Sequence, residues 1–347
     1  MIRSFVALCS LLSATTAFAA ATSLHSPWDA HPVKQTNVPY TCPALAHLAP
    51  DLTTDGFYRL DDPTHSIVDP VRMAAYKASA DPVKELGLSI VKAGDAYRMT
   101  GSRVAAACVT NQVIALANDK ALTGVMSSSQ SYYVQGWVGG AIAIAYLKVR
   151  DAHLASPQQQ NAIDAWLLKI GEATKDFYDR HAEKQADGNN HLYWAGVELA
   201  AIAVVANDQK DFQWALAAYD NGVNQIQPDG TLPLEMARGT RALHYHLYAL
   251  APLVLIAEFG EANGLDLYAH NHGAIHRLVQ TSIHGLSDSS LFAQRTGIRQ
   301  EAPQTISGDQ IGWAPPYNRR FPDANITRLI AAAPSLSVYY LGGLPPQ

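Results

Sequence analysis

From about Pro82 onward, apolar side chains recur at every third or fourth position along the chain. This spacing places them on one face of an α-helix, so it predicts amphipathic helices rather than strands. Short joints such as Asn207-Asp208 and Asn263-Gly264 separate the periodic segments and predict antiparallel neighbours. The segments that we expect to be helical lie near 83–98, 101–117, 132–153, 157–180, 190–206, 210–224, 240–262 and 271–285.

A succession of helices joined in this way is compatible with two all-α architectures. One is an α/α toroid, in which helical hairpins form a ring, and the other is an α-solenoid. A solenoid is built from a repeat of fixed period, and the sequence shows no persuasive repeat. We therefore expect an all-α protein with a toroidal arrangement of hairpins.

The first residues have the features of a secretory signal peptide. Arg3 precedes the apolar run 5–12, and the triplet Ala17-Phe18-Ala19 follows it. The run is shorter than the roughly 20 residues that cross a bilayer. We expect residues 1–19 to be a cleaved leader and the protein to be periplasmic or secreted, without a membrane anchor. Because no Ser/Gly-rich or Pro-rich linker divides the remainder, residues 20–347 are expected to form one domain.

Two cysteines, Cys42 and Cys108, remain after the leader, which contains Cys9. In an oxidising compartment a pair of this kind predicts one long-range disulfide. The alternative is that both are small buried thiols.

The net charge of −5, from 25 Lys and Arg against 30 Asp and Glu, argues against a nucleic-acid partner. A groove that concentrates basic side chains can still bind an anionic polymer, because the local field differs from the net charge.

Residues 40–80 differ from the rest because they are rich in Tyr, Asp, Pro, Thr and Ser. Within them, the polar stretch 59–65 predicts a loop. Long polar loops in compact domains often cover functional sites. The alternative is an ordered surface strap.

A first polar and aromatic cluster occupies residues 187–194. Asp187, Gly188 and Asn189 are residues that cap a helix, so Asn190 and His191 are expected in its first turn, where unpaired backbone N–H groups attract anions. The alternative is an ordinary capped helix with a structural histidine.

A second cluster spans residues 235–248. Arg238, Arg241, Tyr245 and Tyr248 follow one another at helical spacing and would form one stripe if the helix starts early enough. Unpaired buried arginines are costly, so we expect this stripe to line a groove. The alternative is a solvated structural face.

Together the clusters supply an amide, an imidazole, guanidinium groups and a phenol, without an evident pair of catalytic carboxylates. Most glycosidases need such a pair. The set instead suits β-elimination from a uronate, in which the enzyme neutralises a carboxylate and removes the neighbouring C5 proton. Asn190 and Arg238 are suitable donors. Neighbouring Arg or charged His would lower the pKa of Tyr245 and make it a usable base.

Several strings with coupled spacing resemble one known family. They are Asn189-Asn190-His191 with Tyr193-Trp194-Ala195, Arg238 with Arg241-Ala242-Leu243 and Tyr245-His246, Leu232-Pro233, Asn263-Gly264-Leu265-Asp266-Leu267 and Asn271-His272-Gly273-Ala274. With these strings the chain resembles the alginate lyases of polysaccharide lyase family 5 over about residues 130–290.

The resemblance implies an incomplete α/α toroid with a long substrate groove and no metal requirement. It also implies a catalytic set of Asn190, His191, Arg238 and Tyr245. Asn190 and Arg238 would neutralise the substrate carboxylate. Tyr245 would act at the C5 proton and at the leaving O4, and His191 would assist as a base or carboxylate partner. A disulfide in the N-terminal part is compatible with this family.

The stereochemistry of the sugars narrows the substrate. In β-D-mannuronate and β-D-glucuronate the C5 proton and O4 lie on the same side, so a single Tyr245 can serve as base and then as acid. Leu192 and His244 stand where alginate-specific relatives often carry small residues, which leaves glucuronan and hyaluronan open beside poly-mannuronate. Because an imidazole changes charge near neutral pH, His244 suggests a pH-dependent preference.

Further residues are candidates for substrate contact: Tyr133, Trp137, Trp194 and Tyr248 for stacking on sugar rings, Arg241 and His244 beside them, and Arg319 or Arg320 for a distal carboxylate. His272 and His276 have the spacing of metal ligands on a helix, but no third ligand is evident, so we expect no metal and no other cofactor. We expect a monomer. The competing interpretation is a periplasmic polyuronate-binding or export-scaffold protein without catalysis.

Overall fold

The computed structural model describes residues 23–181, 188–301 and 307–346, and this part of the chain is all-α. The expected leader, residues 1–19, lies outside the described residues. The longer helices are α1 (Pro70–Thr100), α2 (Arg103–Asp119), α3 (Ser129–Val149), α4 (Pro157–His181), α5 (Asn190–Ala206), α6 (Gln209–Gln225), α8 (Ala242–Ala262) and α9 (His270–Ser287). The shorter ones are α7 (Pro233–Met236), α10 (Ser290–Thr296), α11 (Gly308–Ile311), α12 (Ala314–Arg320) and α13 (Ala324–Ala332).

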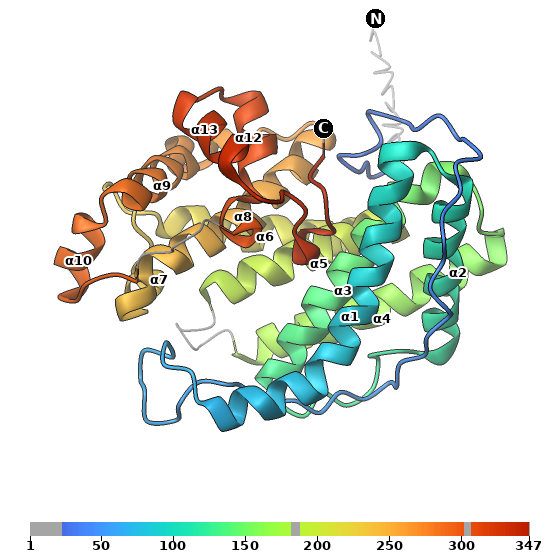
Figure 1. The fold of residues 1–347 in the computed structure, drawn as a ribbon, viewed down its shortest axis with the longest axis horizontal. Helices are drawn as coiled ribbons and strands as arrows, with labels where there is room; N and C mark the ends of the chain where they lie inside the picture. Colours follow the sequence, from blue (N-terminus) through green and yellow to red (C-terminus); the bar gives the residue numbers. More distant parts are fainter. Residues whose placement is uncertain (1–22, 182–187, 302–306, 347) are drawn as a thin grey trace, which may run out of the picture.

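Helices α3 and α5 form the centre of the molecule. Helix α3 packs against α1, α2, α4 and α5, and α5 packs in turn against α4, α6 and α8. Helices α1 to α4 gather on one side and α6 to α10 on the other, with α5 between them (Figure 1). The predicted incomplete α/α toroid is confirmed.

The central helices are apolar on almost every face because they are surrounded by other helices. The segment Gly239–Ala262, which contains α8, is by length and composition able to cross a membrane, but 89% of its most apolar window is buried inside the molecule. Packing in the core of the ring therefore accounts for its apolar character.

Helix α1 begins earlier than the sequence predicts. The expected start near residue 83 is wrong because the helix begins at Pro70 and continues through Pro82. The Asp69 side chain accepts hydrogen bonds from the backbone N–H groups of Val71 and Arg72, and a proline is well suited to the first helical position. Residues 70–82, which composition alone assigns to the preceding loop, therefore belong to the helix.

The regular part of helix α9 begins later than residue 271, where the apolar pattern predicts the helix to start. Asn271, His272 and Gly273 have positive φ angles of 48°, 57° and 67°, so regular helix starts only after them. The helical spacing assumed between His272 and His276 is therefore broken. His276 Nδ1 lies 2.6 Å from the Tyr317 hydroxyl, and the described part of the chain holds no cluster of three or more potential metal ligands.

The segment before α1 runs as a strap over the ends of α1, α2 and α3. The predicted disulfide between Cys42 and Cys108 is formed, with the two Cα atoms 5.6 Å apart, and it fastens the strap to α2. The Gln112 side chain adds two hydrogen bonds to the backbone of Ala46. These contacts fix the segment that leads into the polar loop at residues 58–67.

The C-terminal segment is held against the centre by a buried ion pair. Lys148 on α3 is fully buried and donates to Asp95 Oδ1 on α1 at 2.6 Å. Its ammonium also donates to the carbonyl oxygens of Gly342 and Leu344 at 2.6 and 2.8 Å. The segment carries the short 3-10 helix η5 (Tyr339–Leu341), which is thereby placed next to α3.

Candidate active site

The first cluster lies at the start of α5, as its cap residues Gly188 and Asn189 predict, while Asp187 lies outside the described residues. The Asn189 side chain accepts from the His191 N–H and caps the helix. Asn190 is fully buried, and its backbone N–H and side-chain Nδ2 both donate to Glu235, at 2.8 Å and at 2.9–3.0 Å. The first turn of α5 is therefore tied to the short helix α7, which carries Glu235.

His191 is a neutral imidazole in this structure. Its ring stacks on Tyr133 at a centroid distance of 3.9 Å and lies 6.1 Å from Trp137, both on α3. Burial, and then the positive charge of Arg238, lower the pKa of His191 to about 3. Its Nδ1 atom is buried and has no hydrogen-bond partner in the described part of the chain.

The second cluster does not form one continuous helical stripe. Arg238 precedes the 3-10 turn Gly239–Arg241 (η3), and α8 starts only at Ala242. The expectation of a single α-helical stripe is wrong for the two arginines because Gly239 adopts a left-handed φ of 57° and interrupts the helix. The turn nevertheless directs Arg238 back over α8, where its guanidinium lies 3.5 Å from the centre of the Tyr245 ring and donates to the Tyr245 hydroxyl at 2.5 Å.

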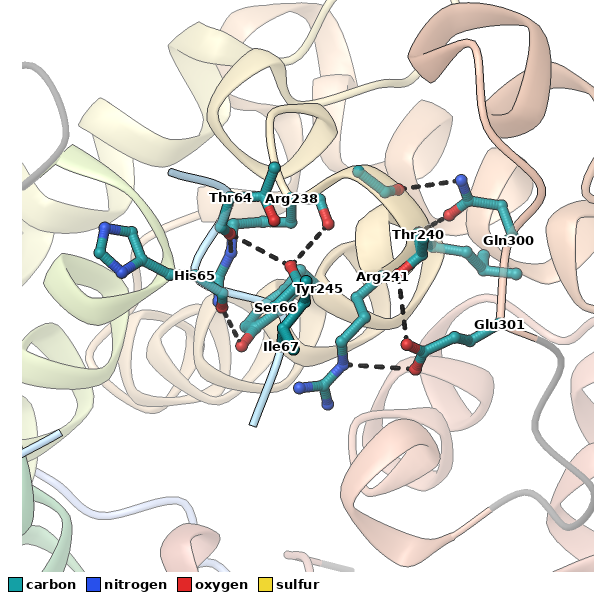
Figure 2. A network of polar contacts seen from close by, with 12 residues as sticks. Thr64, His65, Ser66, Ile67, Arg238, Thr240, Arg241, Tyr245, Gln300 and Glu301 are labelled. Atoms are coloured by element: carbon teal, nitrogen blue, oxygen red, sulfur yellow. Dashed lines mark hydrogen bonds and ion pairs between the residues drawn. The ribbon is translucent and has the colours of Figure 1, made fainter. Parts of the chain in front are cut away.

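Gln300 and Glu301 lie beside this turn, next to Thr240 and Arg241 (Figure 2). Gln300 Nε2 donates to the Gly239 carbonyl and its Oε1 accepts from the Leu243 N–H, so one side chain joins the turn to the start of α8. Glu301 lies 3.6 Å from Arg241 Nε. The positions of both arginines thus depend on a segment distant in sequence.

The polar loop at residues 58–67 lies directly on Tyr245 and Arg238 (Figure 2). Tyr58 and Tyr245 share a hydrogen bond of 2.7 Å between their hydroxyl groups, and Arg241 Nη1 donates to the Tyr58 hydroxyl at 2.8 Å. Arg238 donates to the carbonyl oxygens of Thr64 and His65. The structure shows both features expected for this region, since the segment before the loop is an ordered strap and the loop itself contacts the candidate site residues.

Burial sets the pKa of Tyr245. It raises the pKa above the ordinary value of 10, while the charges of Arg238 and Arg241 act in the opposite direction with a smaller effect. The expectation of a lowered pKa is wrong, because the hydroxyl is enclosed and the neighbouring imidazoles carry no charge: burial also lowers the pKa of His244 to about 4.

An aromatic row connects the two clusters. It runs from His244 and Tyr248 on α8 through Trp194 on α5 to Tyr340 in η5, and then to Trp137 on α3, with successive ring centroids 5.0–6.2 Å apart. Trp137 and Tyr133 complete the row beside His191. Aromatic faces spaced in this way suit the stacking of sugar rings.

Comparison with known proteins connects this arrangement with one family. Residues 55–292 match the family described as Alginate lyase. A polysaccharide lyase from Stenotrophomonas maltophilia is 38% identical over 82% of this chain and 83% of its own length. An alginate lyase from Pseudomonas syringae pv. syringae is 32% identical over 75% of this chain and 69% of its own. The chain belongs to the alginate lyase family. It is a polysaccharide lyase.

Solved structures of lower identity share the fold of this polysaccharide lyase. Alginate lyase A1-III from Sphingomonas species A1 superimposes with a TM-score of 0.73, at 24% identity, over 92% of this chain and 89% of that one. A variant of A1-III complexed with a tetrasaccharide gives a TM-score of 0.75 over 92% and 88% of the two chains.

The structure of this lyase brings together every candidate site residue except the distal arginines. Arg319 and Arg320 pair instead with Glu258 near the opposite end of α8. That is about 20 Å along the helix from Tyr245, at a rise of roughly 1.5 Å per residue. A role for Arg319 in binding a distant sugar stays a prediction.

Three residues of this site are not identifiable from sequence patterns. Glu235 lies within the second cluster but looks like an ordinary first-turn acid of α7, and Tyr58 is one aromatic residue in a polar loop. Tyr340 comes from the C-terminal segment, more than 90 positions beyond Tyr248. Only the tertiary contacts place them beside Asn190, Tyr245 and Trp137.

Proposed function

We propose that this lyase cleaves 1,4-linked polyuronates, and poly-β-D-mannuronate of alginate first, by β-elimination that leaves a 4,5-unsaturated uronate end. The observation that carries the proposal is the Tyr245 hydroxyl, which is hydrogen-bonded to Arg238 and to Tyr58. His191 and the aromatic row lie in the same cluster. The names of the relatives support alginate as the substrate.

In the proposed reaction, Arg238 and Asn190 bind the carboxylate of the sugar whose C5 proton is removed. Their positive or partly positive N–H groups stabilise the negative charge that spreads onto this carboxylate in the transition state. Because Arg238 is buried and already held by the loop carbonyls, its position requires little reorganisation when the charge develops.

Tyr245 would take the C5 proton as a phenolate and then return a proton to O4 as the glycosidic bond breaks, so that one side chain is base and acid in turn. The donors Arg238 and Tyr58 stabilise the phenolate. His191, neutral at working pH, would assist as a second proton acceptor or as a partner of the carboxylate.

The raised pKa of Tyr245 predicts a direction for the pH dependence. The phenolate fraction of the free enzyme is small at neutral pH and rises about tenfold per pH unit until the pKa is reached. We therefore expect kcat/KM to increase with pH through the neutral range.

His244 is our candidate for substrate preference. It stacks at 6.2 Å on Tyr248 and touches the edge of Tyr245, so it lies beside the reacting group. We propose that it admits glucuronan and hyaluronan beside poly-mannuronate. Because burial lowers the pKa of His244 to about 4, its imidazole gains a charge only in the acidic range, and we expect a change of preference with pH there rather than near neutrality. Equal activity on all three polymers at every pH would contradict this.

We also propose that the leader at residues 1–19 directs the protein to the periplasm or the medium, where it acts as a monomer. The disulfide supports an oxidising compartment.

The test follows ultraviolet absorbance of the new C4=C5 double bond on poly-mannuronate, poly-guluronate, glucuronan and hyaluronan across pH. We expect Tyr245→Phe to lower kcat by about 100- to 10,000-fold. Tyr146→Phe is the matched control, because its hydroxyl bonds only to Gln160 in the described structure. Absence of any double bond, with polymer binding intact, would indicate a binding protein instead.

A further inference from the structure

We propose that Glu235 is a positioning residue of this site: as a neutral carboxylic acid, it holds the Asn190 amide with its nitrogen turned toward the substrate carboxylate. This inference rests on the proposed function and adds to it a residue outside the predicted catalytic set.

Glu235 and Asn190 are hydrogen-bonded to each other in the interior of the protein. Both residues are fully buried. The Asn190 backbone N–H donates to Glu235 Oε1 at 2.8 Å, and the amide Nδ2 faces both carboxyl oxygens at 3.0 and 2.9 Å. The amide oxygen Oδ1 is buried and has no hydrogen-bond partner in the described part of the chain. One of the two ends of the amide is therefore unsatisfied in this orientation.

Turning the amide over exchanges its oxygen and nitrogen in nearly the same space. If Glu235 carries a proton, its O–H donates to Asn190 Oδ1, and its other oxygen still accepts from the Asn190 backbone N–H. Oδ1 is then satisfied, and Nδ2 occupies the buried position that Oδ1 held, where its two hydrogens have no protein partner and would need a ligand acceptor. The proton on Glu235 thus determines which end of the amide the site presents.

The surroundings of Glu235 favour the neutral form. Burial raises its pKa, and this effect is opposed by the Asn190 hydrogen bonds and by the charge of Arg238. Arg238 makes no ion pair with Glu235 within the described structure, since its guanidinium is engaged by Thr64, His65 and Tyr245. A buried charge without an ion-pair partner is costly.

The titratable groups on the helices around Glu235 do not supply a positive charge that would stabilise its ionised form. On α5 these are Tyr193, whose pKa is raised, and His191, which is neutral. On α8 the neutral His246 accepts from the Leu232 N–H at the start of α7. On α10 Arg295 pairs with Asp229.

The orientation matters for the proposed reaction. With Nδ2 toward the substrate, Asn190 donates to the carboxylate and stabilises the charge that develops there. With Oδ1 in that place, two oxygens would face each other and the substrate would be repelled. Glu235 is thus required as a hydrogen-bond donor and not as an anion.

The decisive variants are Glu235→Gln and Glu235→Leu. A glutamine amide reproduces the neutral acid, because its Nε2 donates to Asn190 Oδ1 and its Oε1 accepts from the Asn190 N–H. We expect Glu235→Gln to keep kcat within about threefold of the wild type and to lack the loss of activity that ionisation of Glu235 would cause in the wild type as pH rises. We expect Glu235→Leu to lower kcat by about 100-fold, because it leaves the Asn190 amide unheld.

Circular dichroism and thermal unfolding check that both variants fold. If Glu235→Gln folds and is as inactive as Glu235→Leu, the site needs the carboxylate charge and the proposal is overturned. The same holds if both variants keep wild-type activity, because Asn190 then needs no positioning.

A second measurement does not depend on activity. The infrared difference spectrum of wild type minus Glu235→Gln at neutral pH should contain the carbonyl band of a neutral carboxylic acid, and a carboxylate band alone overturns the proposal. If this band is present but the wild type cleaves no polyuronate, the proposed function has failed while the Glu235–Asn190 arrangement stands.

Discussion

Glu198 lies two turns beyond His191 on α5, at the base of a small pocket lined also by Tyr133, Trp137 and Thr174. Its carboxyl group accepts from the Thr174 hydroxyl at 3.0–3.1 Å and makes no ion pair in the described part of the chain. A glycine at 136 on α3 provides the room, because a Cβ there would lie 2.6 Å from Glu198 Oε2. Burial raises the pKa of Glu198 to about 8.

This shift predicts a pH-dependent cost to stability. The native protein keeps the proton on Glu198 up to about pH 8, whereas the unfolded chain releases it near the ordinary value of 4.5. The free energy of unfolding should therefore fall as pH rises between these values. Glu198→Gln should remove this decline and raise stability near pH 7 by up to about 3 kcal/mol.

Urea unfolding of wild type and variant at several pH values measures the difference. Glu172→Gln is the control, since Glu172 is exposed and pairs with Lys169 on the same helix. A decline of equal slope in wild type and Glu198→Gln would contradict the assignment to Glu198.

At the scale of single residues, the sequence identifies those whose chemistry is visible in a local motif. Asn190 and His191 follow cap residues, and Arg238 and Tyr245 belong to a string of coupled spacing, so all four can be selected as candidates, while their catalytic roles stay predictions. Their ionisation is not, because the pKa of Tyr245 depends on enclosure by Tyr58 and the loop.

At the scale of elements, the loop at residues 58–67 is organised by one side chain. Asp62 accepts from the N–H groups of Thr64, Ser66 and Ile67 and from the Thr64 hydroxyl. These bonds close the turn that presents the Thr64 and His65 carbonyl oxygens to Arg238. The loop therefore has a defined shape of its own and contributes to placing Arg238.

Asp62→Ala should release this turn and lower kcat/KM by roughly 10- to 100-fold, with a small change in global stability, because the affected hydrogen bonds are confined to the loop. Asp61→Ala is the matched control. Asp61 is exposed and bonds only to Arg59 within the described structure, so it should remain close to wild-type activity. Similar losses in both variants would show that loop charge matters rather than loop shape.

Helical periodicity is sufficient to predict the elements of the ring. Helix α5 begins and ends where the pattern indicates, and α4 differs by one residue at its end. The expected range 132–153 is wrong at both ends, because α3 spans Ser129–Val149, and the short helices α7 and α10 to α13 are not predicted by the apolar pattern. Other failures lie where a cap or a left-handed residue intervenes. Asp69 starts α1 early, and the left-handed residues at 239 and 271–273 interrupt helices that an apolar pattern extends.

At the scale of the whole molecule, the site is assembled from parts far apart in the chain. Tyr58 comes from the strap before α1, and Tyr340 from the segment held by Lys148. No local pattern predicts these contacts. They depend on how the strap packs against α8 and how the C-terminal segment packs against α3.

Lys148→Met should loosen the C-terminal segment by removing the bonds to Gly342 and Leu344, and leave Asp95 buried without its cation. We expect the free energy of unfolding to fall by about 3–5 kcal/mol, and KM to rise because Tyr340 no longer completes the aromatic row. Lys169→Met removes an exposed ion pair and should change stability far less than Lys148→Met does. Denaturant unfolding and substrate titration measure both effects, and equal losses in the two variants would contradict a special role for the buried pair.

The contact between the loop and Tyr245 has a consequence for how a long polymer would be processed. Tyr58 is hydrogen-bonded to the Tyr245 hydroxyl, which we propose as the reacting group. If this contact has to break when polymer binds, the loop would lift for each new stretch of polymer to enter and for each fragment to leave. Such gating steps often limit turnover. The rate at which the bound polymer slides along the groove, relative to the rate at which the loop opens, would then set how many cuts one polymer receives per encounter. This number determines the size of the fragments released early in a digest.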